Sequence, residues 1–178
     1  MVIKDSGARR QFATGAVRDI QEGKGRCDLL PLDVVSGIYF HNTDNYGASK
    51  VMKAISEFVK TGEVGYLMNA IDYFLLDSTP FGDSNWSTLF MEVSKHFEEG
   101  CKKYGENNWQ KGIPAHCYVD SAVRHYLKYI RGDKDEPHDR AFIWNLICCI
   151  WTCNNKPELN DYAKGGETVE SQIAVATE

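Results

Sequence analysis

Residues 92–145 of the chain read EVSKHFEEGCKKYGENNWQKGIPAHCYVDSAVRHYLKYIRGDKDEPHDRAFIWN. This stretch contains three segments of helical character, joined by two polar connections, KKYGENNWQKGIP at 102–114 and RGDKDEP at 131–137. A short connection such as 131–137 usually joins neighbouring helices of a bundle. We therefore expect the second and third helices to pack roughly antiparallel, which brings their polar faces together.

Outside this stretch, apolar residues also recur at helical spacing, and Gly or Pro stands near the expected helix ends. The pattern predicts an all-α fold, a bundle of about five to six helices in one domain. The expected parts are an extended N-terminal arm at 1–32, a short helix at 33–40, a helical hairpin at 48–77, core helices at 85–153, a domain end at 159 and a disordered tail at 160–178.

The composition is that of an ordinary globular protein, with 178 residues, 43% hydrophobic and 25% charged. A net charge of -5 argues against binding duplex nucleic acid, which requires clustered Lys and Arg. The six cysteines form no CxxC pair, and we find neither a signal-peptide pattern nor an apolar run long enough to span a membrane. We expect a soluble cytoplasmic protein.

The first of the three helices carries an acidic face. Glu92, His96 and Glu99 are separated by four and three residues, so they can converge on one point. Two carboxylates one helical repeat apart suit Mg²⁺, which prefers oxygen ligands. The alternative is a solvated face on which the acids form ion pairs with neighbouring lysines.

The second and third helices contribute further polar residues. His116, Asp120 and Arg124 follow one another at intervals of four, although Asp120 and Arg124 also suit a simple intrahelical salt bridge. Asn145 lies in a helix that is otherwise apolar nearly all round, so its amide needs hydrogen-bond partners. It is either a satisfied core amide or a group that contacts a ligand.

Two loop regions have ambiguous roles. Trp109 stands between two glycines, where an exposed indole would stack on a base and a buried one would fix the loop to the helices. In the N-terminal arm, basic residues among glycines suit an anion, or else form a solvated tail. These residues are Arg9, Arg10, Arg18, Lys24 and Arg26.

Several motifs together resemble a known family. The segments GARRQF, TGAVRDIQEGKGRCDLLP, KKYGENNWQKG, SAVRHYLKYIRG and EPHDRAFIWN are similar to a phage and prophage family, the dATP/dGTP diphosphohydrolase N-terminal domain or MazZ-like proteins. That family is grouped loosely with the all-α MazG-type nucleoside triphosphate pyrophosphohydrolases. The resemblance covers about 5–45 and 85–155, and the helices between look like an insertion.

The resemblance implies Mg²⁺-dependent hydrolysis of a purine deoxynucleoside triphosphate between the α and β phosphates, in the cytoplasm of a phage host. It implies metal-binding and catalytic roles for Glu92, Glu99 and Asp120, with Glu98 as a further candidate ligand. It places phosphates against Lys103, Arg124 and His125, and sugar or base against Trp109, His138 and Asn145.

The carboxylate motif departs from that of MazG-type enzymes, which carry EExxE on one helix and an ExxD-like pair on another. Here the first helix reads EVSKHFEE. On the other helix, which reads HDRAFIWN, Asn145 stands where the motif is expected to end in Asp. A second hypothesis is therefore a non-catalytic protein that sequesters a nucleotide and antagonises host nucleotide signalling. A structural interaction protein is a third reading, and for each we expect a homo-oligomer.

Overall fold

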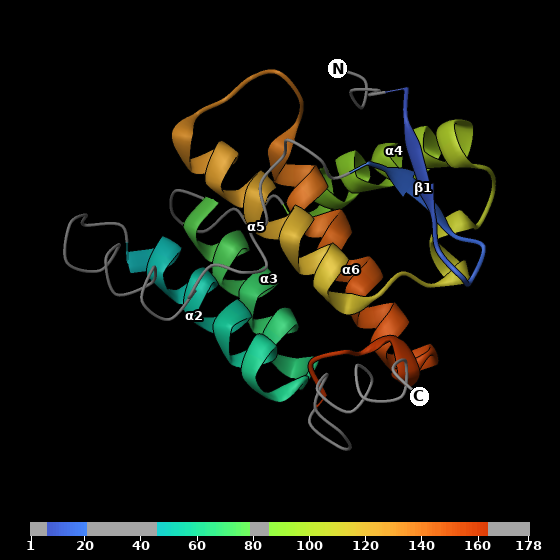
Figure 1. Cartoon of the computed structure of the whole chain (residues 1–178). Coiled ribbons are helices and arrows are strands. Elements are labelled where there is room, and N and C mark those ends of the chain that lie inside the picture. Colours follow the sequence, from blue (N-terminus) through green and yellow to red (C-terminus); the bar gives the residue numbers. More distant parts are fainter. Residues whose placement is uncertain (1–6, 21–45, 79–85, 164–178) are drawn as a thin grey trace.

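The computed structural model describes residues 7–20, 46–78 and 86–163 (Figure 1). Two short strands come first, followed by five α-helices and two 3-10 turns. The elements are β1 (Arg9–Gln11), β2 (Val17–Asp19), α2 (Tyr46–Thr61), α3 (Gly65–Ser78), α4 (Trp86–Tyr104), η2 (Asn108–Lys111), α5 (Ala115–Arg131), α6 (His138–Asn155) and η3 (Pro157–Leu159). The prediction of an all-α bundle is confirmed, and α2 and α3 form the expected hairpin.

Helix α6 lies at the centre of the bundle (Figure 1). It packs against α5, α4 and α3, and Phe142, Ile143 and Leu146 are completely buried. A helix with neighbours on several sides needs apolar residues all round, which explains its sequence. The expected pairing of the last two helices is also confirmed, because α5 and α6 make the most extensive contact between elements.

The connection between α5 and α6 is set by a glycine. Gly132 has a φ of +82°, in the left-handed region, and its amide donates to the carbonyls of Lys128 and Tyr129. Glycine is the residue best suited to this helix-ending conformation. The chain then turns through a short acidic loop and enters α6 at His138, so the loop residues lie beside the C-terminal half of α5.

The described part of the N-terminal arm is a β-hairpin docked on the helices. β1 and β2 pair antiparallel, with Arg9 opposite Asp19. Asn108 binds the backbone of Val17 twice, through its Oδ1 atom to the amide and its Nδ2 atom to the carbonyl, at 3.0 Å each. Residues 7–20 are therefore not a solvated tail. The rest of the arm, from residue 21, and the expected helix at 33–40 lie outside the described residues.

The C-terminal segment corrects one prediction. Residues 160–163 were expected in a disordered tail, but Asn160 donates to the carbonyl of Gly62 at 2.9 Å, and the Tyr162 ring lies 5.5 Å from that of Phe58. These contacts are tertiary and join segments about 100 residues apart, so helical periodicity did not reveal them. The remainder of the expected tail, 164–178, lies outside the described residues.

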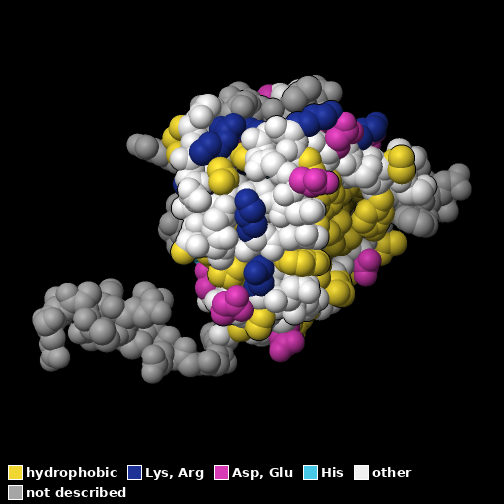
Figure 2. Space-filling model, turned by 90° about the vertical axis from the view of Figure 1, so that its right-hand side faces the viewer, with side chains coloured by type: hydrophobic (Ala, Val, Ile, Leu, Met, Phe, Trp, Pro, Cys, Tyr) yellow, Lys and Arg dark blue, Asp and Glu magenta, His cyan; other side chains and the backbone are white. Residues whose placement is uncertain are grey.

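The surface combines charged and hydrophobic areas. Figure 2 shows hydrophobic side chains gathered beside scattered Lys and Arg on one face. In the described ranges, the exposed large hydrophobic residues are Met68, Leu76, Phe90, Met91 and Tyr129. Such residues suit an interface, and the homo-oligomer stays a prediction. The described helices include none with the length and apolar character of a membrane-spanning segment.

Candidate functional site: a cleft between the hairpin and three helices

A cleft of about 470 Å³ lies between β2, α4, η2, α5, the first half of α6 and the loop that precedes α6. This volume is within the range of roughly 300–1,000 Å³ typical of small-molecule sites. Five of the residues that were assigned to the site line it, namely Trp109, Asp120, Arg124, His125 and Asn145. Four other assigned residues, Glu92, Glu99, Lys103 and His138, are not part of its lining.

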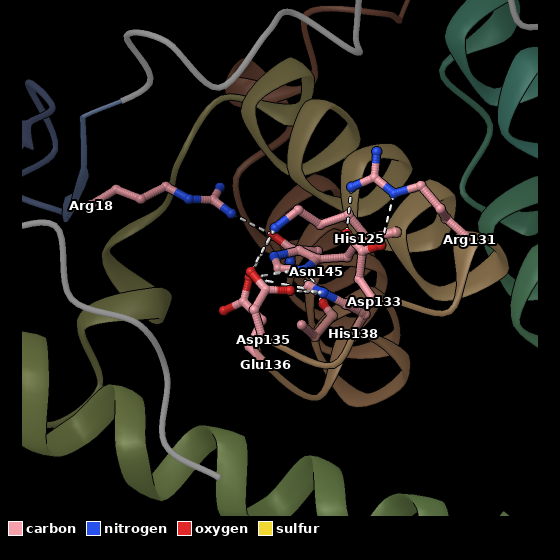
Figure 3. Close-up of polar contacts among 10 residues, drawn as sticks. Arg18, His125, Arg131, Asp133, Asp135, Glu136, His138 and Asn145 are labelled. Atoms are coloured by element: carbon pink, nitrogen blue, oxygen red, sulfur yellow. Dashed lines mark hydrogen bonds and ion pairs between the residues drawn. The ribbon is translucent and has the colours of Figure 1, made fainter.

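Arg18 of β2 crosses the cleft to reach Asn145 of α6 (Figure 3). Its Nη2 atom donates to the Asn145 Oδ1 atom at 2.5 Å, and its Nη1 atom donates to the Cys117 carbonyl at 3.0 Å. The Asn145 Nδ2 atom donates to the Ala141 carbonyl at 2.7 Å. Asn145 is thus a satisfied buried amide that also lines the cleft. In the described part of the chain, both hydrogen-bond acceptors of Arg18 are neutral and its guanidinium lies 5.3 Å from the centroid of the Tyr118 ring, so no carboxylate forms an ion pair with it.

His116, Asp120 and Arg124 were expected on one face of their helix, but the structure gives them different partners. Asp120 and Arg124 form an intrahelical ion pair at the cleft, as in the simpler of the two interpretations. His116 instead contacts Asp161 in the C-terminal segment. The hydrogen bond to Asp161, helped by the Cys117 thiol, raises the pKa of His116 to about 10. His116 therefore anchors the C-terminal segment and does not line the cleft.

Three side chains bind the carboxylate of Asp19, which follows Arg18 on β2. Lys103 donates to its carboxylate at 2.9 Å, the Tyr104 hydroxyl donates at 3.0 Å, and Arg9 lies 3.1 Å away. Burial, and then the charge of Asp19, raises the pKa of Tyr104 well above its ordinary value. Lys103, expected to bind phosphate, is therefore engaged with Asp19 in this structure.

The carboxylates of α4 are held by an arginine that the sequence did not single out. Arg140 of α6, almost completely buried, donates to Glu99 at 2.7 Å and lies 3.8 Å from Glu92, which also pairs with Lys95. A buried guanidinium requires such carboxylate partners. Glu98 pairs with Lys102 and is exposed.

The carboxylates expected to bind Mg²⁺ do not gather at one point. Among the described residues, Glu92, Glu99 and Asp120 are absent from the groups of three ligand atoms that lie within 4.8 Å of one another. Only Asp120 lines the cleft, and it faces Arg124. This arrangement does not fit the predicted Mg²⁺ site, whose ligand assignment stays a prediction.

His96, on the same helix, turns toward the cleft rather than toward the two glutamates. Its ring lies 5.3 Å from that of Trp144. Burial, aided by the charge of Arg140, lowers the pKa of His96 to about 3, so the imidazole is neutral near pH 7. In the described part of the chain, neither its Nδ1 atom nor the Trp144 Nε1 atom has a hydrogen-bond partner.

An aromatic group forms one wall of the cleft. The Trp109 ring lies 5.3 Å from Phe97 and 5.0 Å from Trp151, in edge-to-face contacts. The interpretation that Trp109 fixes its loop to the helices is confirmed. Trp109, Phe97 and Trp144 also line the cleft, so this wall offers an apolar surface to a planar ligand.

The loop before α6 forms a histidine–carboxylate cluster, which we define as His125, Asp135, Glu136 and His138 (Figure 3). The two histidines face each other with their Nδ1 atoms 3.0 Å apart. Asp135 binds the Nε2 atom of His138 at 2.8 Å. Sequence reasoning missed both acids, whose only signal was the acidic run DKDEP ahead of the helix. The cluster joins α5 to the first turn of α6.

Burial lowers the pKa of His125 well below its ordinary value, and the nearby His138 lowers it further. The hydrogen bond from His138 is the main cause that lowers the pKa of Asp135, with Lys128 adding to it. His125 is therefore neutral near pH 7, and Asp135 is ionised.

Comparison with known proteins gives a match at the level of the family. The family model described as dATP/dGTP diphosphohydrolase, N-terminal, matches residues 75–162, about half of the chain. The matched part begins in the last turns of α3 and includes α4, α5 and α6, which build most of the cleft. Searches of curated proteins and of solved structures returned no significant match.

Proposed function

Residues 75–162 belong to the dATP/dGTP diphosphohydrolase N-terminal family, and on this premise we propose that the cleft binds and hydrolyses a purine deoxynucleoside triphosphate. The products would be the deoxynucleoside monophosphate and pyrophosphate. The observation that carries the proposal is Arg18, a cation held in the cleft by two neutral oxygens. The phage origin and the host cytoplasm as location, both implied by the resemblance, are parts of this proposal.

The arrangement of the cleft suggests how the ligand would lie. Arg18, Arg124 and Lys128 all line the cleft, so their charges can act on the phosphates. The base would lie along the aromatic wall formed by Phe97, Trp109 and Trp144. Arg124 would first have to exchange Asp120 for a phosphate oxygen.

The dependence on Mg²⁺ remains part of the proposal inherited from the resemblance. Mg²⁺ usually keeps several waters and binds through one or two carboxylates together with the phosphates of a nucleotide. The carboxylates of α4 are held by Arg140, outside the cleft lining. We therefore assign no catalytic step to Mg²⁺ at these residues.

The ion pairs of the cleft favour a second candidate function, the sequestration of a nucleotide without hydrolysis. Asp120 is paired with Arg124, and Asp19 with Lys103. A carboxylate held in this way is a poorer base or metal ligand than a free one. The same cleft would still bind a nucleotide through Arg18 and the aromatic wall.

One assay separates the two functions. Purified protein is incubated with dATP, dGTP and cyclic nucleotides in Mg²⁺ buffer, with and without EDTA, and products are separated by ion-exchange chromatography. Release of a deoxynucleoside monophosphate with pyrophosphate, abolished by EDTA, supports the hydrolase. Intact nucleotide recovered from denatured protein, with no turnover, supports sequestration. If the protein neither binds nor hydrolyses any of these nucleotides, both proposed functions are contradicted.

A matched pair of variants tests the position of the ligand. We expect Arg18→Gln to weaken nucleotide binding about 10- to 100-fold, since it removes a charge-assisted hydrogen bond worth roughly 1.5–3 kcal/mol. Arg9→Gln is the control, because it removes a cation from the same hairpin whose ion pair is with Asp19. Equal affinities of the two variants, measured by titration calorimetry, would contradict the proposed site.

A further inference from the structure

The two histidines and Glu136 of the histidine–carboxylate cluster place three ligand atoms around one point. The Nδ1 atoms of His125 and His138 are 3.0 Å apart, and the Glu136 Oε1 atom lies 3.6 Å and 3.7 Å from them. The circle through three atoms at these separations has a radius of about 2.0 Å, close to metal–nitrogen and metal–oxygen bond lengths of roughly 2.0–2.2 Å. A metal ion near its centre would contact all three atoms without their moving.

We propose that His125, Glu136 and His138 bind a divalent first-row transition metal ion. Two imidazoles and one carboxylate are the ligand set of catalytic zinc sites and of facial iron sites. Mg²⁺ and Ca²⁺ prefer all-oxygen ligands, so they are poor candidates here. The proposal rests on the geometry of the cluster and does not require that the protein hydrolyse a nucleotide.

Asp135 orients His138 for this role. Its ionised carboxylate can only accept a hydrogen bond, so the His138 Nε2 atom, 2.8 Å away, carries the proton. The other ring nitrogen of His138, the Nδ1 atom, faces His125 and Glu136 and is the one positioned to bind a metal. Histidines that bind metals usually donate their other ring nitrogen to a carboxylate in this way.

A second group of three ligand atoms fits a metal less well. It consists of Asp133, Asp135 and His138. It would use the Nε2 atom of His138, which already binds Asp135, and the carboxylate of Asp133, which Arg131 holds. The carboxylate of Glu136 is held less closely by a cation, because the nearest contact, from the Lys128 Nζ atom to its Oε1 atom, is 3.9 Å. Asp133 therefore supplies a control for Glu136.

The proposed ion would be accessible from the cleft. His125 and Glu136 line the cleft, whereas the side chain of His138 is 1% exposed and closes the site from behind. Three protein ligands leave at least one coordination position of such an ion for water or for an anionic group. The cleft lining contains four acidic side chains and four Arg and Lys side chains, so their formal charges cancel. A bound divalent cation would give the lining a net positive charge.

The competing explanation is a simple hydrogen bond between the two imidazoles. His125 would then carry its proton on the Nδ1 atom and donate it to the His138 Nδ1 atom. This explanation predicts no affinity for a metal. It also predicts that Glu136 can be replaced by Gln without effect on metal uptake.

The test is titration of the tag-free full-length protein with Co²⁺ in the absence of nucleotide, followed by visible absorption. We expect one Co²⁺ per chain, displaced by Zn²⁺, with no thiolate charge-transfer band. Glu136→Gln should weaken Co²⁺ binding at least about 10-fold, in line with the losses of roughly 10–100-fold known for changes around metal sites. Asp133→Asn should leave the affinity within about threefold.

The nearly isosteric Glu136→Gln keeps the hydrogen bond between His125 and His138 in place, and circular dichroism checks its folding. No uptake by the wild type, equal affinity in Glu136→Gln, or loss in Asp133→Asn alone would each overturn the proposal. Since no nucleotide is present, failure of the nucleotide assay leaves this result unaffected. If the protein hydrolyses nucleotides but binds no Co²⁺, only the metal-site proposal is overturned and the proposed function stands.

Discussion

At the scale of the single residue, Asn145 shows how a buried polar group can hold a site together. It is 2% exposed, accepts from Arg18 and donates to the carbonyl one turn earlier in α6. Both roles of its amide are therefore filled, and the guanidinium of Arg18 is held between α5 and α6. The sequence left two roles open for Asn145, and in the structure it is a satisfied core amide that also holds the cation of the cleft.

We expect Asn145→Leu to lower the free energy of unfolding by about 1–3 kcal/mol, because a buried donor and acceptor lose their partner. The matched control is Asn155→Leu in the same helix. Asn155 makes the same kind of side-chain hydrogen bond, to the Trp151 carbonyl at 2.8 Å, but is exposed. Its replacement should change stability by less than about 0.5 kcal/mol. Urea unfolding of both variants measures the difference, and equal losses would contradict the role of Asn145.

At the scale of the element, side-chain hydrogen bonds join the β-hairpin to the loop region around η2. Asn108 of η2 replaces a strand neighbour, since it binds both the amide and the carbonyl of Val17. The Thr14 hydroxyl adds a hydrogen bond of 2.6 Å to the Gly112 carbonyl. The position of Arg18 in the cleft therefore depends on a side chain from a distant loop.

Asn108→Ala should destabilise the docked hairpin by about 1–3 kcal/mol, because two backbone groups of Val17 lose partners. We expect faster hydrogen exchange of the β2 amides and weaker nucleotide binding, while the amides of α5 and α6 stay protected. Gln110→Ala, in the same 3-10 turn, is the control. Unchanged exchange of β2 in Asn108→Ala would show that other contacts hold the hairpin.

The element scale also shows which parts of the fold were predictable. The helices α4, α5 and α6 follow from apolar periodicity and from helix-ending residues such as Gly132, which are local signals. The sequence predicts an extended arm here rather than a hairpin, because the two strands have three residues each and carry no long alternating pattern. Its docking depends on Asn108, 91 residues away.

At the scale of the whole molecule, the C-terminal segment connects the two helical hairpins. Asn160 and Tyr162 contact the end of α2, and Asp161 contacts the first turn of α5. Gly62 permits this approach, because a Cβ atom there would lie 2.5 Å from the Cα atom of Ala163. Its φ of +74° also favours glycine.

Gly62→Ala should therefore lower the free energy of unfolding by at least about 1–2 kcal/mol, from the left-handed backbone alone. Gly65→Ala is the control, since a Cβ atom at this first residue of α3 meets open space. It should be neutral or stabilising by up to about 1 kcal/mol. Denaturant unfolding compares the two, and a neutral Gly62→Ala would contradict both the left-handed backbone at Gly62 and its close approach to Ala163.

The charged residues show most clearly where sequence reasoning reached its limit. Spacing along one helix predicted the pair of Asp120 and Arg124 as one alternative, and the structure has it. Spacing also suggested that Glu92, His96 and Glu99 converge. The two glutamates do meet, but at the guanidinium of Arg140, and His96 lines the cleft. Periodicity gives the face of a helix but does not say what lies opposite that face.

The sequence by itself determined the all-α class, the approximate bounds of the helices and the family, because helix propensity, periodicity and motifs are local properties. Tertiary structure alone decided that Arg18 meets Asn145, 127 residues away, and that His125, Glu136 and His138 face one another. Hydrogen bonds and ion pairs act over a few ångströms in space. Their partners are therefore fixed only when the packing of α5, α6 and the hairpin sets those distances.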